Sequence, residues 1–175
     1  MRRIACALVL CALSLLAGSV QAEEIFGLTN TGKLVRFDSA NPGTITGTVT
    51  ISGLQASESL VGIDFRPETG ELFGVGSTSR VYKINVTSGV ATVVGTTPFT
   101  PALNGQNFGV DFNPTVDRIR LVSNLAQNLR LNADTGAVAN TDTALAYSTG
   151  DALAGTAPNV VSIAYTNNVT TNNGA

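Results

Sequence analysis

The chain has 175 residues, with ten lysines and arginines, twelve aspartates and glutamates, and no histidine. The absence of histidine excludes a Ser-His-Asp triad and removes the commonest nitrogen ligand of zinc and copper sites. Because the net charge is slightly negative and the sequence has no basic cluster, nucleic acid and anionic membrane surfaces are poor partners.

The first 22 residues have the three parts of a secretory signal peptide. An arginine pair precedes an apolar core at residues 4–17, and a small-x-small cleavage site ends at Ala22. We therefore expect a secreted or periplasmic protein that begins at Glu23 and does not insert into a membrane after cleavage. Both cysteines, Cys6 and Cys11, lie in this leader, so we expect neither a disulfide nor a thiolate metal ligand in the mature chain.

β-branched and aromatic residues separated by glycine-containing turns predict strands along the rest of the chain. The predicted strands are 25–28, 33–38, 44–51, 60–65, 71–76, 80–86, 90–95, 108–112, 118–123, 128–132, 137–139 and 160–166. Residues 141–155 predict a long surface connection with one helical turn, and residues 168–175 predict a disordered tail. No segment has a sustained helical period, so the predicted fold class is all-β.

Residues 61–90 and 108–137 are two copies of one unit, offset by 47 positions without a gap. The segment 25–38 aligns with the middle of the unit at the same offset, so the repeat starts part-way through a unit. Four short strands in a unit of this length are typical of propeller blades. We predict, over residues 23–167, a β-propeller-like array of about three four-stranded antiparallel blades that is incomplete or open. The identical positions are Gly62/Gly109, Asp64/Asp111, Phe65/Phe112, Pro67/Pro114, Asn85/Asn132 and Gly89/Gly136.

At residues 62–67 and 108–123 the chain resembles a family of exported bacterial proteins known only as a domain of unknown function with a β-propeller-like repeat. Residues 117–120, Asp-Arg-Ile-Arg, are the most specific part of the likeness, and residues 128–136 and 144–147 extend it. The resemblance implies an exported location and a propeller-like fold, and it brings no catalytic or binding residues. Members of the family that the chain resembles look longer, with further units after the equivalent of residues 160–166. The resemblance therefore implies that this chain is truncated at its C-terminus. The alternative is an open array with exposed strand edges, for which an oligomer is expected if the chain is complete.

Asp64 and Asp111 occupy equivalent places in the two copies, each on the strand face that also carries a glycine. If these are the innermost strands, both carboxylates point toward the central axis, where they would bind a cation or form an acid/base pair. The interpretation we favour is structural: each aspartate caps the proline turn that follows it or pairs with a neighbouring arginine, such as Arg118 or Arg120.

Asp111, Asn113 and Asp117 have the oxygen-rich character of a calcium loop. Their spacing does not match an EF-hand and Pro114 divides them, so we favour a turn whose polar groups are satisfied internally and keep calcium as the alternative. The candidate binding residues are thus Asp64, Asp111, Asp117, Arg118 and Arg120. No residue is assigned as catalytic or as a metal ligand.

These patterns predict an exported, non-catalytic binding or scaffold module whose partner is an exported protein or a carbohydrate. Two alternatives stay open. One is a hydrolase or lyase that uses the aspartates, with or without calcium, and the other is a structural component of the envelope or matrix.

Overall fold

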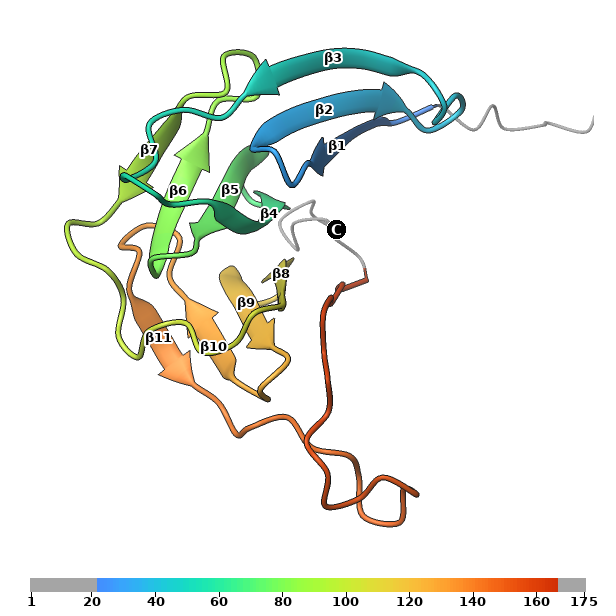
Figure 1. The fold of residues 1–175 in the computed structure, drawn as a ribbon, viewed down its shortest axis with the longest axis vertical. Helices are drawn as coiled ribbons and strands as arrows, with labels where there is room; N and C mark the ends of the chain where they lie inside the picture. Colours follow the sequence, from blue (N-terminus) through green and yellow to red (C-terminus); the bar gives the residue numbers. More distant parts are fainter. Residues whose placement is uncertain (1–21, 167–175) are drawn as a thin grey trace, which may run out of the picture.

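The structure, a computed structural model, describes residues 22–166, and these residues form strands and no helix (Figure 1). Within that range no helix is long and apolar enough to cross a membrane. The all-β fold class is confirmed, whereas the predicted leader, apart from Ala22, and the predicted tail at 168–175 lie outside the described residues. The strands are β1 (Glu24–Leu28), β2 (Lys33–Asp38), β3 (Ile45–Thr50), β4 (Leu60–Arg66), β5 (Glu71–Gly76), β6 (Arg80–Ile84), β7 (Ala91–Val94), β8 (Phe108–Asn113), β9 (Arg118–Ser123), β10 (Asn128–Leu131) and β11 (Val138–Thr141).

The strands form three antiparallel sheets, and within each sheet the strands are adjacent in chain order. We call them the N-terminal sheet (β1-β2-β3), the middle sheet (β4 to β7) and the C-terminal sheet (β8 to β11). The three sheets follow one another along an arc, with β4 and β8 on its inner side (Figure 1). Within residues 22–166 the N-terminal sheet has no counterpart of β4 or β8. This agrees with the sequence repeat, which begins part-way through a unit.

The repeated asparagines close the turns that end β6 and β10. The side-chain oxygen of Asn85 accepts hydrogen bonds from the main-chain N–H groups two and three residues later, at 3.0 and 2.9 Å, and Asn132 does the same one unit further on. The glycines that follow, Gly89 and Gly136, have φ angles of 75° and 71°. A Cβ at either would come within 2.3 Å of a carbonyl oxygen of the preceding sheet, so these turns need glycine for conformation and for close approach.

In the part of the chain that the structure describes, the hydrophobic core consists of two clusters, one at each junction between neighbouring sheets. An edge-to-face phenylalanine pair crosses each junction: Phe26 with Phe65 (5.3 Å between ring centroids) and, one unit later, Phe73 with Phe112 (5.5 Å). The first cluster contains buried Leu34, Leu72, Tyr82, Ile84 and Ala91. The second contains buried Phe73, Val75, Val81, Phe99, Phe112, Ile119, Leu121, Leu129, Leu131 and Ala133.

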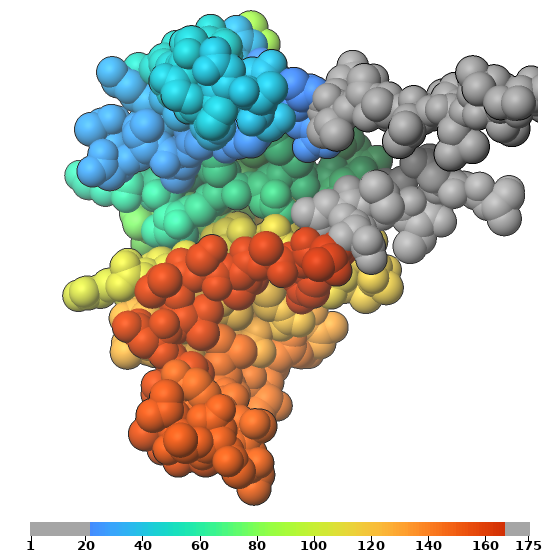
Figure 2. All heavy atoms as spheres, turned by 90° about the vertical axis from the view of Figure 1, so that its right-hand side faces the viewer, coloured from blue at the N-terminus to red at the C-terminus, as the bar shows by residue number. Residues whose placement is uncertain are grey.

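Two local predictions are wrong. Residues 160–166 lie against β8 without forming a strand, because in the described part of the chain no neighbouring main chain pairs with them by backbone hydrogen bonds. The connection after β11 contains three successive single turns, at Ser148–Asp151, Asp151–Ala154 and Leu153–Thr156, and no helical turn. Figure 2 shows the end of this connection, in red, crossing the face of the molecule over the yellow strands of the C-terminal sheet.

Candidate functional site

The repeated aspartates join each unit to the next. Asp64 accepts a hydrogen bond from the main-chain N–H of Phe112 in β8, at 2.6 Å. Asp111 accepts one from the main-chain N–H of Tyr165, at 2.7 Å. The same relation therefore occurs at two successive junctions, and Tyr165 takes the place that Phe112 has one unit earlier. Predicted partners for these carboxylates, a proline turn or an arginine, were wrong: the partner is the backbone of the following unit.

The repeated glycines let these strands approach. A Cβ on Gly62 would lie 2.6 Å from a methyl carbon of Val110 in the next unit. A Cβ on Gly109 would lie 2.8 Å from the backbone nitrogen of Ile163. Real Cβ atoms do not come so close, so Gly62 and Gly109 are required where one inner segment crosses the next.

The carboxyl groups of Asp64 and Asp111 also lie within hydrogen-bonding reach of each other. Burial raises the pKa of Asp64 to about 6, and the charge of Asp111 adds to the rise although the N–H of Phe112 opposes it. Burial likewise raises the pKa of Asp111, against the effect of the Tyr165 N–H. The pair therefore favours holding a shared proton, as close carboxyls do.

Asp117 belongs to an ion-pair cluster around Arg66, which is buried although it is charged. The guanidinium of Arg66 donates to Asp117 through Nε (2.8 Å) and a second nitrogen, and to Asp134 at 2.6 Å. Hydrogen bonding to Arg66 holds the pKa of Asp117 below its usual value. Since Arg66 ends β4 and both aspartates lie in turns of the C-terminal sheet, the cluster connects two units.

The two remaining candidate binding residues, Arg118 and Arg120, also make hydrogen bonds within the protein. Arg118 donates to the main-chain oxygen of Asp117 at 2.7 Å. Arg120 donates to Asp142, to the side-chain oxygen of Asn128 at 2.6 Å, and to the hydroxyl of Tyr165 at 3.2 Å. Hydrogen bonds from Arg130 and from Arg120 outweigh the effect of burial and lower the pKa of Asp142 to about 2.

The residues considered for calcium do not converge. Asp111 faces the N–H of Tyr165, Asn113 accepts from the N–H of Thr115 at 3.0 Å, and Asp117 faces Arg66. Within residues 22–166 no group of three histidine, cysteine, aspartate or glutamate side chains is arranged to hold a metal ion.

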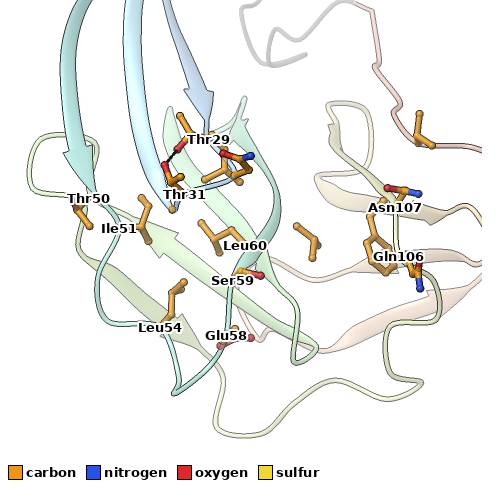
Figure 3. A pocket seen from close by; sticks show the side chains of 16 residues that line it. Thr29, Thr31, Thr50, Ile51, Leu54, Glu58, Ser59, Leu60, Gln106 and Asn107 are labelled. Atoms are coloured by element: carbon orange, nitrogen blue, oxygen red, sulfur yellow. Dashed lines mark hydrogen bonds between the residues drawn. The ribbon is translucent and has the colours of Figure 1, made fainter.

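A concave pocket of about 730 Å³ lies on the inner side of the arc, at the edge where β4 and β8 begin (Figure 3). It is built from the turn after β1, the loop from β3 to β4, the residues before β8, and Val161. Gln106 and Asn107 stand across it from Ser59 and Leu60 (Figure 3). The lining residues are Leu28, Thr29, Asn30, Thr31, Gly32, Thr50, Ile51, Leu54, Glu58, Ser59, Leu60, Val61, Gln106, Asn107, Phe108 and Val161.

The pocket offers neutral hydrogen-bonding groups beside apolar surface. Over the described part of the chain, the side-chain amides of Asn30, Gln106 and Asn107 make no hydrogen bond within the protein. Each amide can donate and accept. The backbone beneath two of them is fixed, because the side-chain oxygen of Asn124 accepts from the N–H groups of Gln106 and Asn107 at 3.0 and 3.2 Å. Half-buried Phe108 adds an aromatic surface next to these amides.

Among the described residues that line the pocket, Glu58 is the one with an ionisable side chain, and hydrogen bonds within the protein hold its carboxylate. Its carboxylate accepts from the N–H of Thr78 (3.0 Å), the N–H of Gln55 (3.3 Å) and the hydroxyl of Tyr82. Burial opposes ionisation, but the hydrogen bonds from Thr78 and Tyr82 outweigh it and hold the pKa of Glu58 below its usual value. Glu58 is thus a fixed anion, poorly suited to act as a general base near neutral pH.

Sequence reasoning did not find the pocket. None of the five candidate binding residues lines it. A usable signal was present in the repeat: Ser59, Leu60 and Val61 are 47 positions before Gln106, Asn107 and Phe108, and all six line the pocket. These positions differ between the copies, so a search for identical residues passes over them.

Most of the sequence matches the model of one protein family. Residues 33–174 match a family described as a domain of unknown function, DUF4394. The chain belongs to the DUF4394 family. The match starts at the first residue of β2, so the DUF4394 region includes both aspartate junctions and much of the pocket. No curated protein matches the sequence.

Proposed function

We propose that this DUF4394 protein is a non-catalytic binding module, and that the pocket at the start of β4 and β8 takes a neutral, hydroxyl-rich ligand such as an oligosaccharide. The observation that carries the proposal is a set of three side-chain amides, from Asn30, Gln106 and Asn107, that make no hydrogen bond to any residue of 22–166. They surround a pocket whose carboxylate, Glu58, is already hydrogen-bonded. Sugar hydroxyls both donate and accept, and amides match them in both roles.

The size and composition of the pocket support a small ligand. Its volume of about 730 Å³ falls in the range of small-molecule sites, which combine apolar walls with a few placed polar groups. Leu28, Leu60 and Phe108 would contact the apolar face of a sugar ring, while the threonine hydroxyls after β1 lie at the rim.

The proposed architecture is propeller-like, with the inner strands β4 and β8 around an axis and the pocket at one end of it. The repeated antiparallel sheets and the repeated junction contacts support this arrangement. The leader composition at residues 1–22 supports export to a compartment where glycans are accessible.

The test is binding of neutral oligosaccharides, using a panel of gluco-, xylo- and manno-oligosaccharides and titration calorimetry on each one that binds. The double variant Gln106→Ala/Asn107→Ala should weaken the affinity at least tenfold, because each hydrogen bond contributes about 1 kcal/mol. Asn41→Ala, at an exposed turn away from the pocket, is the matched control and should leave affinity unchanged.

Two results would overturn the proposal. One is that no panel member binds at millimolar concentration. The other is hydrolysis or elimination of a bound sugar that is lost in Asp64→Asn, which would favour the carboxylate-dependent enzyme instead.

A further inference from the structure

The loop before β8 contains an asparagine that is followed directly by a glycine, Asn104-Gly105. The sequence has one other such pair, Asn173-Gly174, which lies outside the described residues. Glycine has no Cβ to shield its own main-chain nitrogen, so this nitrogen can approach the side-chain carbonyl carbon of the asparagine before it. The loop therefore holds a side chain that is able to react with the backbone of the next residue.

The reacting groups of this pair are free of hydrogen bonds to the described residues. Asn104 is exposed, and neither its side-chain amide nor the N–H of Gly105 bonds to any residue of 22–166. The N–H groups on either side are held. That of Asn104 donates to Oε1 of Gln127 at 2.9 Å, and that of Gln106 donates to Oδ1 of Asn124 at 3.0 Å. The loop is fixed around a pair whose own reactive atoms are available.

Other asparagines between residues 22 and 166 lack this combination. The side-chain oxygens of Asn85 and Asn132 accept main-chain N–H groups in their turns, which holds those side chains in place. Asn107 lies in the same loop as Asn104, but the residue after it is Phe108, whose side chain shields the main-chain nitrogen. Asn107 is therefore the natural internal comparison for Asn104.

The pocket wall requires the glycine of the pair. Gly105 has a φ angle of 141°, and a Cβ there would lie 2.7 Å from Oδ1 of Asn124. That oxygen accepts the N–H groups of Gln106 and Asn107, two residues whose amides line the pocket. The close approach that fixes the wall thus excludes a side chain at position 105, so the reactive pair is part of how the wall is built.

We propose that Asn104 is a site of spontaneous deamidation. The main-chain nitrogen of Gly105 attacks Cγ of Asn104, and the side-chain nitrogen leaves as ammonia with the proton that the attacking nitrogen loses. The product of this step is a succinimide ring. Water then adds to one ring carbonyl and breaks its bond to nitrogen. Opening at the side-chain carbonyl gives aspartate, and opening at the main-chain carbonyl gives isoaspartate.

Both products change the wall of the pocket. Each places a new negative charge at the start of the segment that carries Gln106 and Asn107. Isoaspartate also moves Cβ into the main chain, which lengthens the backbone next to two N–H groups that share one acceptor, Asn124. Because hydrogen bonds weaken steeply when their geometry is lost, isoaspartate should release these two N–H groups. An effect on sugar binding would rest on the proposed function, whereas the modification itself does not.

The first measurement is tandem mass spectrometry of peptides from the folded chain, after incubation at mildly alkaline pH, which favours loss of the proton from the attacking nitrogen. Asn104 should exchange its amide nitrogen for oxygen about tenfold faster than Asn30 or Asn107, which no glycine follows. Part of the product should be isoaspartate, which an isoaspartyl methyltransferase labels. Asn104→Gln is the control variant and should lose both signals.

The second measurement is amide hydrogen exchange of the isoaspartate form, separated from the unmodified chain by its extra charge on an anion-exchange column. The N–H groups of Gln106 and Asn107 should exchange about tenfold faster or more than in the unmodified chain. Asn104→Asp carries the new charge without the longer main chain, so it is the matched control. Its exchange at these two positions should equal that of the unmodified chain.

Three results would overturn the inference. One is conversion of Asn104 no faster than that of Asn107. Another is aspartate without isoaspartate, because a succinimide gives both. The third is unchanged exchange at Gln106 and Asn107 in the isoaspartate form. A chain that deamidates at Asn104 and binds no sugar would remove the proposed function alone, and a chain that binds sugar without deamidating would remove this inference alone.

Discussion

The carboxylate of Asp64 lies 2.6 Å from the main-chain nitrogen of Phe112, a residue of the following unit whose side chain is fully buried. Asp111 has the same relation to Tyr165. Residues that look like a candidate catalytic pair in the sequence thus contribute to the contact between successive inner segments. This arrangement leads to the first prediction.

Asp64→Ala should lower the free energy of unfolding by about 1–3 kcal/mol, because it leaves the N–H of Phe112 without an acceptor at a buried position. Asp64→Asn keeps an oxygen in the same place and should cost less than Asp64→Ala. Urea denaturation followed by circular dichroism measures both. Equal losses in the two variants would contradict a role for the oxygen as acceptor.

The Asp64 and Asp111 pair should make stability depend on pH. The folded-state pKa of Asp64 is raised from 3.8 to about 6, so between these values the folded protein binds more protons than the unfolded chain. Stability contributed by this group is present below pH 4, falls as the pH rises toward 6 and is then constant. Thermal unfolding across this range should show a slope that Asp64→Asn reduces. An unchanged slope in that variant would assign the effect to other carboxyls.

Arg66→Ala should destabilise the fold by about 2–3 kcal/mol, because it removes a buried guanidinium and leaves Asp117 and Asp134 without their cation. Arg118→Ala is the matched control. Arg118 bonds main-chain oxygens, so we expect a loss of less than about 1 kcal/mol. Chemical denaturation compares the two variants, and similar losses would show that the Arg66 cluster has no special role.

Gly62→Ala should cost about 1–3 kcal/mol, since the added methyl would lie 2.6 Å from Val110 across the junction. Gly43→Ala introduces the same methyl at a turn where no atom lies within 4 Å, and it should be close to neutral. Differential scanning calorimetry separates them. A neutral Gly62→Ala would mean that the inner strands can move apart without cost.

The strands could be predicted because each one repeats a local pattern. Residues 71–76 and 118–123 match β5 and β9 at both ends, since polar turns flank each strand on both sides. The segment 160–166 has the same apolar pattern and yet is not a strand. Ladder formation depends on a neighbouring main chain, and a local pattern carries no information about that neighbour.

The junction contacts were only partly accessible from sequence. Comparison of the two copies identifies Asp64 and Asp111 as repeated residues. It cannot identify the groups that donate hydrogen bonds to them, because those donors are backbone N–H groups, which every residue except proline has. Arg66 corresponds to Asn113 in the second copy, so its cluster exists at one junction and leaves no repeated trace. The pocket was missed for a related reason, because it is formed by loops that differ from unit to unit.

The two core clusters share no residue, since one joins the first two sheets and the other joins the last two. Damage to one junction should therefore stay local in its immediate effect. A cavity made by Leu34→Ala should speed amide hydrogen exchange in β2 and β5 well before β10 is affected. Such a chain can also accept compensating core substitutions during evolution, because side-chain volume can be redistributed within one junction while the packing of the other junction stays unchanged.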